Sequence, residues 1–232
     1  MTTTPRTTAA TDPARPGARE RNPRGQGGRL RDDILSAATD LLDESGTEES
    51  VTLRAVARRA GISAPAIYGH FADRQTILLA VVQGAFAELH ERLRAAARAE
   101  DEGNEDDPVA RLHRVCAAYL DFAATRPQRY RAMFGGLWNT QRALAEENVT
   151  AGDLTDLGQD ALEVLATALQ DCVAAGCSGS DDPRGDAVAL WLGLHGLAHQ
   201  RVVTAAFPWP ADIVDRLVVP LAHLVPAADG GR

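Results

Sequence analysis

The chain has 232 residues, of which 45% are hydrophobic, and its formal net charge is −8. This apolar content is enough to build a core, which excludes a mainly disordered protein. The longest apolar run, AVALWLGLHGLA at 187–198, is too short to cross a membrane, and the N-terminus lacks the apolar region of a secretory signal. The three cysteines are too few for a disulfide framework, so a cytoplasmic setting is expected.

Positive charge is concentrated in two regions of this acidic chain. Residues 1–31 hold seven arginines against two acidic residues, a net charge of +5. Residues 50–74 hold four arginines against one aspartate, a net charge of +3. Such an asymmetry is typical of a protein with one nucleic-acid-binding end.

The first part of the chain is predicted to be an arm followed by a small helical domain. Residues 1–28 have almost no large apolar side chain, so they are expected to form a disordered basic arm. Apolar residues at helical spacing begin at Leu30 and stop before Gly46, which predicts the first helix of a domain spanning 29–75.

Two short helices and one long helix are expected next. Thr52 is the expected N-cap of the first, and Gly61 ends it. Ser63 is the expected N-cap of the second, with Pro65 in its first turn, where a missing N–H costs nothing. Asp73 then caps a linking helix that runs over 73–100.

Residues 76–226 are predicted to form a helical C-terminal body, followed by a flexible tail at 227–232. An acidic segment with a glycine at 100–107 separates the linking helix from the next one, which opens at Pro108. No alternating strand pattern and no repeat occur, so the chain is predicted to be all-α with about nine helices. The remaining helices are expected at 126–138, 153–175, 186–206 and 211–225.

Two short helices joined by RRAGIS and preceded by a longer one suggest a helix-turn-helix. The stretch TLRAVARRAGISAPAIYGHFADRQTILLAVV resembles the DNA-binding domain of the TetR family of bacterial regulators, and the match covers residues 29–90. YLDFAATRPQRYRAMFGG and ALWLGLHGLAHQRV resemble a TetR-associated C-terminal domain named for a Trp-His-Gly motif, here Trp191, His195 and Gly196. The resemblance implies a three-helix reading head, a ligand-binding body and a homodimer.

The DNA-contacting residues expected from this register have different physical roles. A helix N-terminus such as that at Thr52 favours a phosphate. Arginines on the first helix of the motif lie where it crosses the DNA backbone, and small side chains on the second allow a close approach to bases and thymine methyl groups. The expected contacts are Thr52, Arg54, Arg58, Ser63, Ala64, Pro65, Ala66, Tyr68, His70 and Arg74.

Other arginines near these contacts have less defined roles. Arg59 is expected to be solvated. Arg24, Arg29 and Arg31 could enter a minor groove from the arm, as arms of related motifs do. A basic tail without a defined role is the alternative reading.

The segment 186–206 is apolar nearly all round, which predicts burial on two sides. We expect it to form a four-helix dimer interface together with 153–175 and their symmetry mates, as the TetR resemblance also implies. Small residues would allow close packing there, and His195 would be hydrogen-bonded inside the interface. The expected dimer residues are Ala189, Gly193, His195 and Gly196.

An effector pocket is implied among the middle helices of each subunit. Its expected apolar and aromatic character suits a small, mainly apolar or aromatic molecule. No cationic cluster points inward, so a highly charged effector is disfavoured. The candidate lining residues are Tyr119, Phe122, Met133, Phe134, Trp138 and Trp191.

The expected function is a ligand-responsive, dimeric transcriptional regulator, most simply a repressor released from a palindromic double-stranded operator. A transcriptional activator and a DNA-binding protein that senses no ligand are alternatives. His195 and His199 share one helical face and could bind a metal in an enzyme, but no third ligand stands out, so no metal, cofactor or catalytic residue is expected. Cys172 and Cys177 could form a redox pair, although packed thiols are the simpler reading.

Overall fold

The computed structural model describes residues 27–99, 107–134 and 150–225. Within these ranges the chain forms ten α-helices and one 3-10 helix, and no β-strand, which confirms the all-α prediction. The expected arm up to residue 26, most of the acidic segment, Trp138 and the tail at 227–232 lie outside the described residues.

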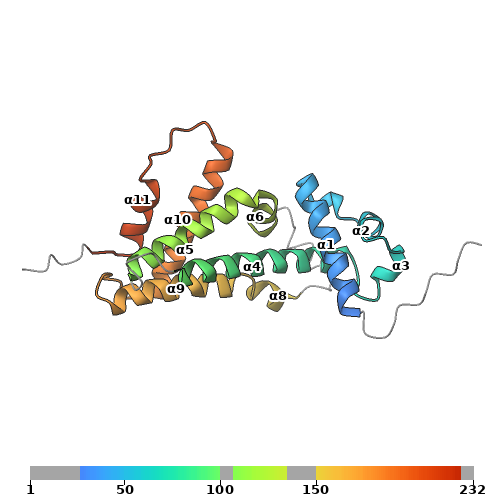
Figure 1. Ribbon diagram of the computed structural model, residues 1–232, viewed down its shortest axis with the longest axis horizontal. Helices are drawn as coiled ribbons and strands as arrows, with labels where there is room; N and C mark the ends of the chain where they lie inside the picture. The colour runs from blue at the N-terminus through green and yellow to red at the C-terminus, as the bar shows by residue number, and fades with distance from the viewer. Residues whose placement is uncertain (1–26, 100–106, 135–149, 226–232) are drawn as a thin grey trace, which may run out of the picture.

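The first five elements form the N-terminal domain and the linking helix. Helix α4 is the longest of them, with 25 residues, and Figure 1 shows it running along the long axis of the molecule. The bounds are α1 Gly27–Ser45, η1 Glu48–Ser50, α2 Leu53–Arg59, α3 Ala64–Ile67 and α4 Arg74–Arg98.

The other elements form the body, in which α5 and α9 both pack against α4, and α10 packs against α9. Helices α10 and α11 pack together at the end of the molecule far from α1–α3 (Figure 1). The bounds are α5 Pro108–Thr125, α6 Pro127–Phe134, α8 Ala151–Thr155, α9 Gln159–Ala174, α10 Pro183–Val203 and α11 Ile213–Leu221.

Two expected helix caps are present, and a third differs. The Thr52 hydroxyl accepts a hydrogen bond from the Ala55 N–H at 3.1 Å. Asp73 forms a capping box with Thr76, in which each side chain accepts a backbone N–H of the other residue, so α4 begins at a defined position. Ser63 stands at the N-cap position of α3, but its side chain makes no capping hydrogen bond.

Two hydrophobic cores lie side by side along α4. The first core is formed by α1–α3 and the first half of α4 and includes Ile67 and Ile77, both fully buried. The second core is formed by the second half of α4 with α5, α9, α10 and α11 and includes Leu89 and Leu169. Because both cores use α4, the N-terminal domain and the body share one continuous helix.

Three of the expected helices of the body differ from their predicted bounds, and the one predicted at 186–206 spans Pro183–Val203. The segment predicted as one helix at 153–175 is two helices, because Gly158 adopts a left-handed φ of 80° between α8 and α9. The helix predicted at 211–225 spans only Ile213–Leu221. No described helix is both long and apolar enough to cross a bilayer.

Gly158 should tolerate a side chain less well than another glycine of the same conformation. A Cβ atom on Gly158 would lie 2.7 Å from the Phe86 ring, whereas one on Gly176, whose φ is 74°, would meet nothing within 4 Å. We predict that Gly158→Ala lowers the free energy of unfolding by about 2–4 kcal/mol, since left-handed strain and a steric clash both contribute. Urea unfolding measures this loss.

Gly176→Ala is the matched control, because it introduces the left-handed strain without the clash. Its expected cost is about 1 kcal/mol. Equal losses for the two variants would show that the contact between Gly158 and Phe86 does not constrain the chain.

Candidate DNA-binding surface and ligand cavity

The turn between α2 and α3 is built by a glycine. Gly61 has a φ of 68°, the Ile62 N–H donates to the Ala57 carbonyl at 2.9 Å, and the Gly61 N–H donates to the Arg58 carbonyl at 3.3 Å. This pair of hydrogen bonds is the Schellman motif that ends many helices. It turns the chain sharply, and α3 follows two residues later as the second helix of the expected helix-turn-helix.

The expected DNA contacts lie around these two helices, mostly on the surface. Tyr68, directly after α3, is 60% exposed, while its neighbour Ile67 is fully buried in the core. A large aromatic side chain held out in solvent beside a buried anchor is available to a partner. Thr52, Arg54, Arg58, Ser63, Pro65 and Tyr68 are exposed, and Ala64, Ala66, His70 and Arg74 are half-buried.

The arginines of this surface differ in their partners. Arg59 is exposed to solvent, as expected, and it also forms a two-pronged contact with Glu44, with nitrogen–oxygen distances of 2.8 and 2.5 Å. Arg54 and Arg58 are exposed and make no ion pair with any residue that the structure describes. These two cations are therefore free to meet phosphate.

Arg74 has a structural role that the sequence pattern did not indicate. Its Nε donates to the Val51 carbonyl at 2.8 Å, and its Nη2 donates to the Glu48 carbonyl and lies 3.9 Å from the Glu48 carboxylate. The side chain therefore fastens the loop before α2 to the start of α4. The DNA contact expected of Arg74 stays a prediction, and it would have to use the guanidinium N–H groups that are not engaged by Val51 and Glu48.

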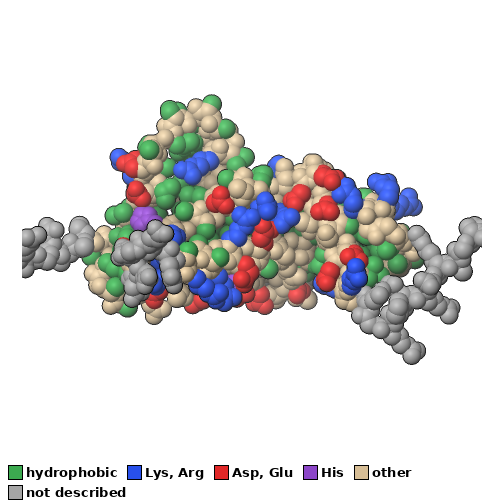
Figure 2. Space-filling model, in the orientation of Figure 1, with side chains coloured by type: hydrophobic (Ala, Val, Ile, Leu, Met, Phe, Trp, Pro, Cys, Tyr) green, Lys and Arg blue, Asp and Glu red, His purple; other side chains and the backbone are tan. Residues whose placement is uncertain are grey.

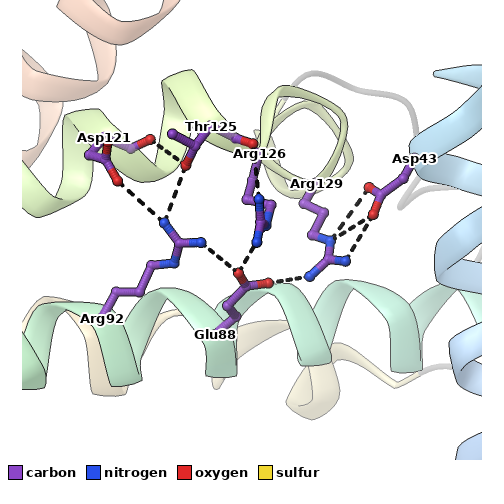
Figure 3. A network of polar contacts seen from close by, with 7 residues as sticks. All are labelled: Asp43, Glu88, Arg92, Asp121, Thr125, Arg126 and Arg129. Carbon is purple, nitrogen blue, oxygen red and sulfur yellow. Dashed lines mark hydrogen bonds and ion pairs between the residues drawn. The ribbon is translucent and has the colours of Figure 1, made fainter.

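A network of ion pairs joins the N-terminal domain to the body (Figure 3). Arg129 of α6 donates to Asp43 of α1, at 2.8 Å from Nη2 and 3.1 Å from Nε, and also to Glu88 of α4. Glu88 further accepts from Arg92 at 3.0 Å and from Arg126 at 3.2 Å. Helices α1, α4 and α6 thus meet at the guanidinium of Arg129, which connects the N-terminal domain to the body.

Electrostatics favour this arrangement despite partial burial. Burial alone would raise the pKa of Glu88, but the hydrogen bonds and charges of Arg129, Arg92 and Arg126 outweigh it and hold that pKa below its usual value. The carboxylate is therefore ionised wherever the network is intact.

Helix α6 also packs into both cores. Ala132 is buried in the N-terminal core, and Tyr130, two residues earlier, is buried in the core of the body. At the start of α6, Gln128 lies so close to Gly46 that a Cβ atom there would be 2.9 Å from the Gln128 Oε1. A shift of α6 would therefore disturb the C-terminal end of α1.

An apolar cavity of about 170 Å³ lies inside the body, and we call it the inner cavity. Its walls come from α4, α5, α6, α9 and α10, and the described residues that line it include no Asp, Glu, Lys or Arg. Its lining residues are Phe86, Leu89, Leu93, Val115, Tyr119, Phe134, Leu157, Gly158, Gln159, Ala161, Leu162, Leu165, Trp191 and Leu194.

Three of the six expected pocket residues line the inner cavity, namely Tyr119, Phe134 and Trp191. Phe122 is fully buried in the core of the body instead, and Met133 packs against that core without reaching the cavity. Trp138 lies outside the described residues. The contributions of α4 and α9 to the walls were not foreseen.

His195 belongs to a hydrogen-bonded cluster within the subunit. Its Nδ1 lies 2.7 Å from the Tyr130 hydroxyl and 3.3 Å from the Tyr119 hydroxyl. Burial, with a smaller contribution from nearby His199, lowers the pKa of His195, so the ring is neutral at physiological pH. Tyr119 and Tyr130 both have raised pKa values because of burial.

The residues expected at a dimer interface are only partly on a free face. Gly193 packs against α11 of its own chain, where a Cβ atom would lie 2.9 Å from Leu221, and His195 faces the two tyrosines. Gly196 has open space around it. Helix α9 turns its apolar side into its own subunit, and the polar residues Glu163, Thr167 and Gln170 are exposed along its other side.

Exposed apolar side chains gather instead on α10 and α11 (Figure 2). Leu192, Val202 and Val203 of α10 are 55%, 56% and 63% exposed, and Val219 of α11 is 43% exposed. We call these four residues the α10–α11 face. Exposed apolar side chains on two helices that pack together are candidates for a contact with another protein surface.

The described residues offer little support for a metal site at His195 and His199 or for a redox pair of Cys172 and Cys177. Among these residues no three His, Cys, Asp or Glu side chains group to hold a metal ion. Cys172 is buried, and burial raises the pKa of its thiol to about 12, while the Cys177 thiol donates to the Cys172 carbonyl at 3.3 Å. A thiol with so high a pKa is a poor nucleophile, which favours packed thiols.

The Arg129 network should contribute measurably to stability. Arg129 is 24% exposed and serves two carboxylates, so we predict that Arg129→Gln lowers the free energy of unfolding by about 1–3 kcal/mol. Chemical denaturation of the purified protein measures this loss.

Arg184→Gln is the matched control, because Arg184 and its partner Glu163 are 62% and 57% exposed. Exposed ion pairs contribute little, so a change within about 0.5 kcal/mol is expected. Similar losses from both variants would show that the Arg129 network stabilises the protein no more than an exposed ion pair does, and that it does not hold the two parts together.

Two family models match the chain. One, described as bacterial regulatory proteins of the tetR family, matches residues 34–81, and the other, described as the C-terminal domain of tetracyclin repressor-like proteins, matches residues 112–223. The second description names no Trp-His-Gly subtype, so that subtype stays a prediction.

Two curated relatives match parts of the chain. It is 36% identical over 69 residues to the tetracycline repressor protein class A from transposon 1721 of Escherichia coli, covering 30% of this chain and 31% of that protein. It is 28% identical over 117 residues to the HTH-type transcriptional activator FasR of Mycolicibacterium smegmatis, covering 50% and 51%. The chain thus spans about a third to a half of these relatives' length.

Solved structures share the fold over most of the chain. A protein of unknown function from Rhodococcus sp. RHA1 has a TM-score of 0.66 at 24% identity, covering 87% of this chain and 95% of that one. The TetR family transcriptional regulator PfmR from Thermus thermophilus has a TM-score of 0.56 at 20% identity, covering 83% and 99%. Because both domains match models of one family, the chain belongs to the TetR family of DNA-binding transcriptional regulators.

Proposed function

We propose that this chain is a homodimeric repressor that releases a palindromic operator when a small, mainly apolar or aromatic effector occupies the inner cavity. The observation that carries the proposal is the connection through α6. Phe134 of α6 lines the inner cavity, and Arg129 of the same helix holds α1 and α4. An occupied cavity can thus act on the DNA-binding domain through one short helix.

In this proposal α3 enters the major groove and α2 crosses the DNA backbone. The small side chains Ala64, Pro65 and Ala66 allow close approach to the bases, and Tyr68 projects beside them. Positive charge comes from Arg54 and Arg58 of α2, because α3 itself has no Arg or Lys. Phosphate contacts position the protein in this arrangement, and the small residues read the bases.

The proposed dimer forms through the α10–α11 face rather than through α9. Its four residues expose apolar surface, whereas the outward side of α9 is polar. A two-fold dimer would place two reading heads on a palindrome, one on each half-site.

The walls of the inner cavity define the proposed effector. None of its lining residues carries a charge, so the buried part of the effector is uncharged and apolar. The Tyr119 hydroxyl and Trp191 offer limited polar contact. A polar group elsewhere on the effector would have to remain outside this cavity.

Release of DNA requires that the effector bind one arrangement of α6 better than the other, since equal affinity for both shifts nothing. A hundredfold loss of operator affinity corresponds to about 2.7 kcal/mol of coupling, which is within the usual allosteric range. The Arg129 contacts are the proposed carrier of this coupling.

The DNA-binding part of the proposal predicts different effects for two neighbouring arginines. After selection of an operator from random duplexes, Arg58→Ala should weaken operator binding and reduce its salt dependence by about one ion, because one phosphate contact is lost. Fluorescence anisotropy over a series of salt concentrations measures both quantities, and the same titration should give two chains per operator.

Arg59→Ala is the control, since Arg59 already pairs with Glu44. It should leave the salt dependence unchanged. If both variants changed the salt dependence equally, the assignment of Arg58 to a phosphate would be wrong. An operator placed upstream of a promoter that the bound dimer stimulates would favour an activator.

The effector part of the proposal is tested by filling the inner cavity. Toluene, phenol, indole and straight-chain alkanoates are the probes, and at least one should lower operator affinity tenfold or more. Ala161 lines the cavity and is buried, so Ala161→Leu should remove the response while leaving DNA affinity without a probe unchanged. Anisotropy of labelled operator is the readout.

Ala174→Leu is the matched control, because Ala174 is exposed on the same helix and does not line the cavity. It should respond as the wild type does. A wild-type dimer that keeps its operator affinity with every probe would favour the alternative that the protein senses no such ligand.

A further inference from the structure

Phe134 separates the inner cavity from a second, larger cavity. This second cavity measures about 620 Å³, lies between α6 and the last turns of α10, and is here called the outer groove. Phe134 lines both spaces. The outer groove is lined by Ala123, Pro127, Tyr130, Arg131, Phe134, His195, Gly196, His199, Gln200, Val202 and Val203, of which the last two also belong to the α10–α11 face, so the groove opens beside the proposed dimer contact.

The partition between the two spaces is a single layer of rings. The Phe134 ring centroid lies 4.8 Å from that of His195, 5.1 Å from Tyr130 and 6.1 Å from Trp191. Trp191 faces the inner cavity, while Tyr130 and His195 face the outer groove. The same layer of rings therefore forms a wall of each space.

Phe134 is the ring of this layer that can move most easily. Tyr130 and His195 are fixed to each other by a hydrogen bond of 2.7 Å between the hydroxyl and Nδ1. A phenylalanine ring makes no such bond, so rotation of its side chain loses only packing contacts. Phe134 is also the last residue of α6.

The sizes of the two spaces favour their joint use. A cavity of about 150 Å³ holds a single benzene ring, and ligand sites usually measure about 300–1,000 Å³. The inner cavity alone is therefore at the lower limit, so a ligand longer than one ring that enters it would also occupy the outer groove, which at about 620 Å³ is itself within the usual range.

The walls of the two spaces differ in their chemistry. The inner cavity has no charged lining residue. The outer groove has Arg131, His199 and Gln200 at its exposed side and no Asp or Glu among its lining residues. Among the described residues Arg131 makes no ion pair. An apolar space that leads into a groove with such a guanidinium suits an apolar chain that ends in an anion.

We propose that the effector is an elongated, single-chain amphiphile with an anionic head. Its chain passes Phe134 into the inner cavity, and its head lies in the outer groove beside Arg131. The inference rests on the proposed function and refines it by naming the class of effector. Displacement of Phe134 would also move the end of α6. This movement would strain the contacts of Arg129 with α1 and α4.

Chain length is the first test, made by calorimetric titration of the full-length dimer with alkanoates from butanoate to dodecanoate below their micelle concentrations. Each buried methylene should tighten binding about fourfold, so burial of only half of the additional methylenes would make dodecanoate bind more than a hundredfold tighter than butanoate, at one molecule per chain. Affinity that does not depend on chain length would overturn the proposal.

Two variants of Phe134 test the passage itself. Phe134→Trp should block it and remove most of the gain from chain length, whereas Phe134→Ala should open it and strengthen dodecanoate binding. Phe207→Trp is the matched control, because Phe207 is exposed and lines neither space. If dodecanoate affinity were the same in both Phe134 variants and in the control, the chain would not pass Phe134.

The head is tested by comparing dodecanoate with dodecan-1-ol. Arg131→Gln should weaken binding of dodecanoate about tenfold and leave dodecan-1-ol unchanged, whereas Arg201→Gln, on the exposed side of α10, should change neither. An equal effect of Arg131→Gln on both probes would overturn the placement of the head. These binding tests can fail while ring compounds still release the operator, so failure of the inference is distinguishable from failure of the proposed function.

Discussion

The contact of Arg129 with Asp43 and Glu88 is the interaction on which the relation between the two parts of this molecule depends. A guanidinium presents its donors in a rigid, planar fork, so one side chain can bind two carboxylates whose helices point in different directions. Here those carboxylates come from α1 and α4, and the guanidinium comes from α6. The position of α6 relative to the DNA-binding domain is therefore specified by charge as well as by packing.

Partial burial makes this contact more consequential than an ion pair at the surface. Arg129 and Glu88 are each 24% exposed, so solvent screens them less than it screens Arg184 and Glu163. Removal of Arg129 would leave the partly buried Asp43 carboxylate without the counter-charge of this guanidinium, whereas Glu88 would keep Arg92 and Arg126.

The features that the sequence could predict are those encoded by a few neighbouring residues. The caps at Thr52 and Asp73 depend on a side chain and a backbone N–H three positions away, and the turn at Gly61 depends on one residue that tolerates a positive φ. The break at Gly158 escaped prediction because apolar residues continue at helical spacing across it, and only the backbone shows that the helix is interrupted.

Features that depend on the packing of distant segments were predicted less well. Tyr119, Phe134 and Trp191 could be expected near a cavity because they are large and aromatic, but no local pattern shows that Phe122 fills the core while Phe86 borders empty space. Gly193 shows the same limitation. A small residue on an apolar helix permits close approach of some neighbour, and the structure shows that this neighbour is α11 of the same chain.

In the proposed DNA complex, the distribution of charge gives α2 and α3 different roles. Helix α3 carries no cation, so its approach to the bases depends on cations held elsewhere, and Arg54 and Arg58 of α2 are free of ion pairs within the described domain. Specificity from small apolar contacts is modest for a single half-site. Recognition of a complete operator would then depend on the dimer, and hence on the distance between two heads that α4 and α6 hold in place. A regulator built in this way loses its operator when that distance changes, even though each reading head remains intact.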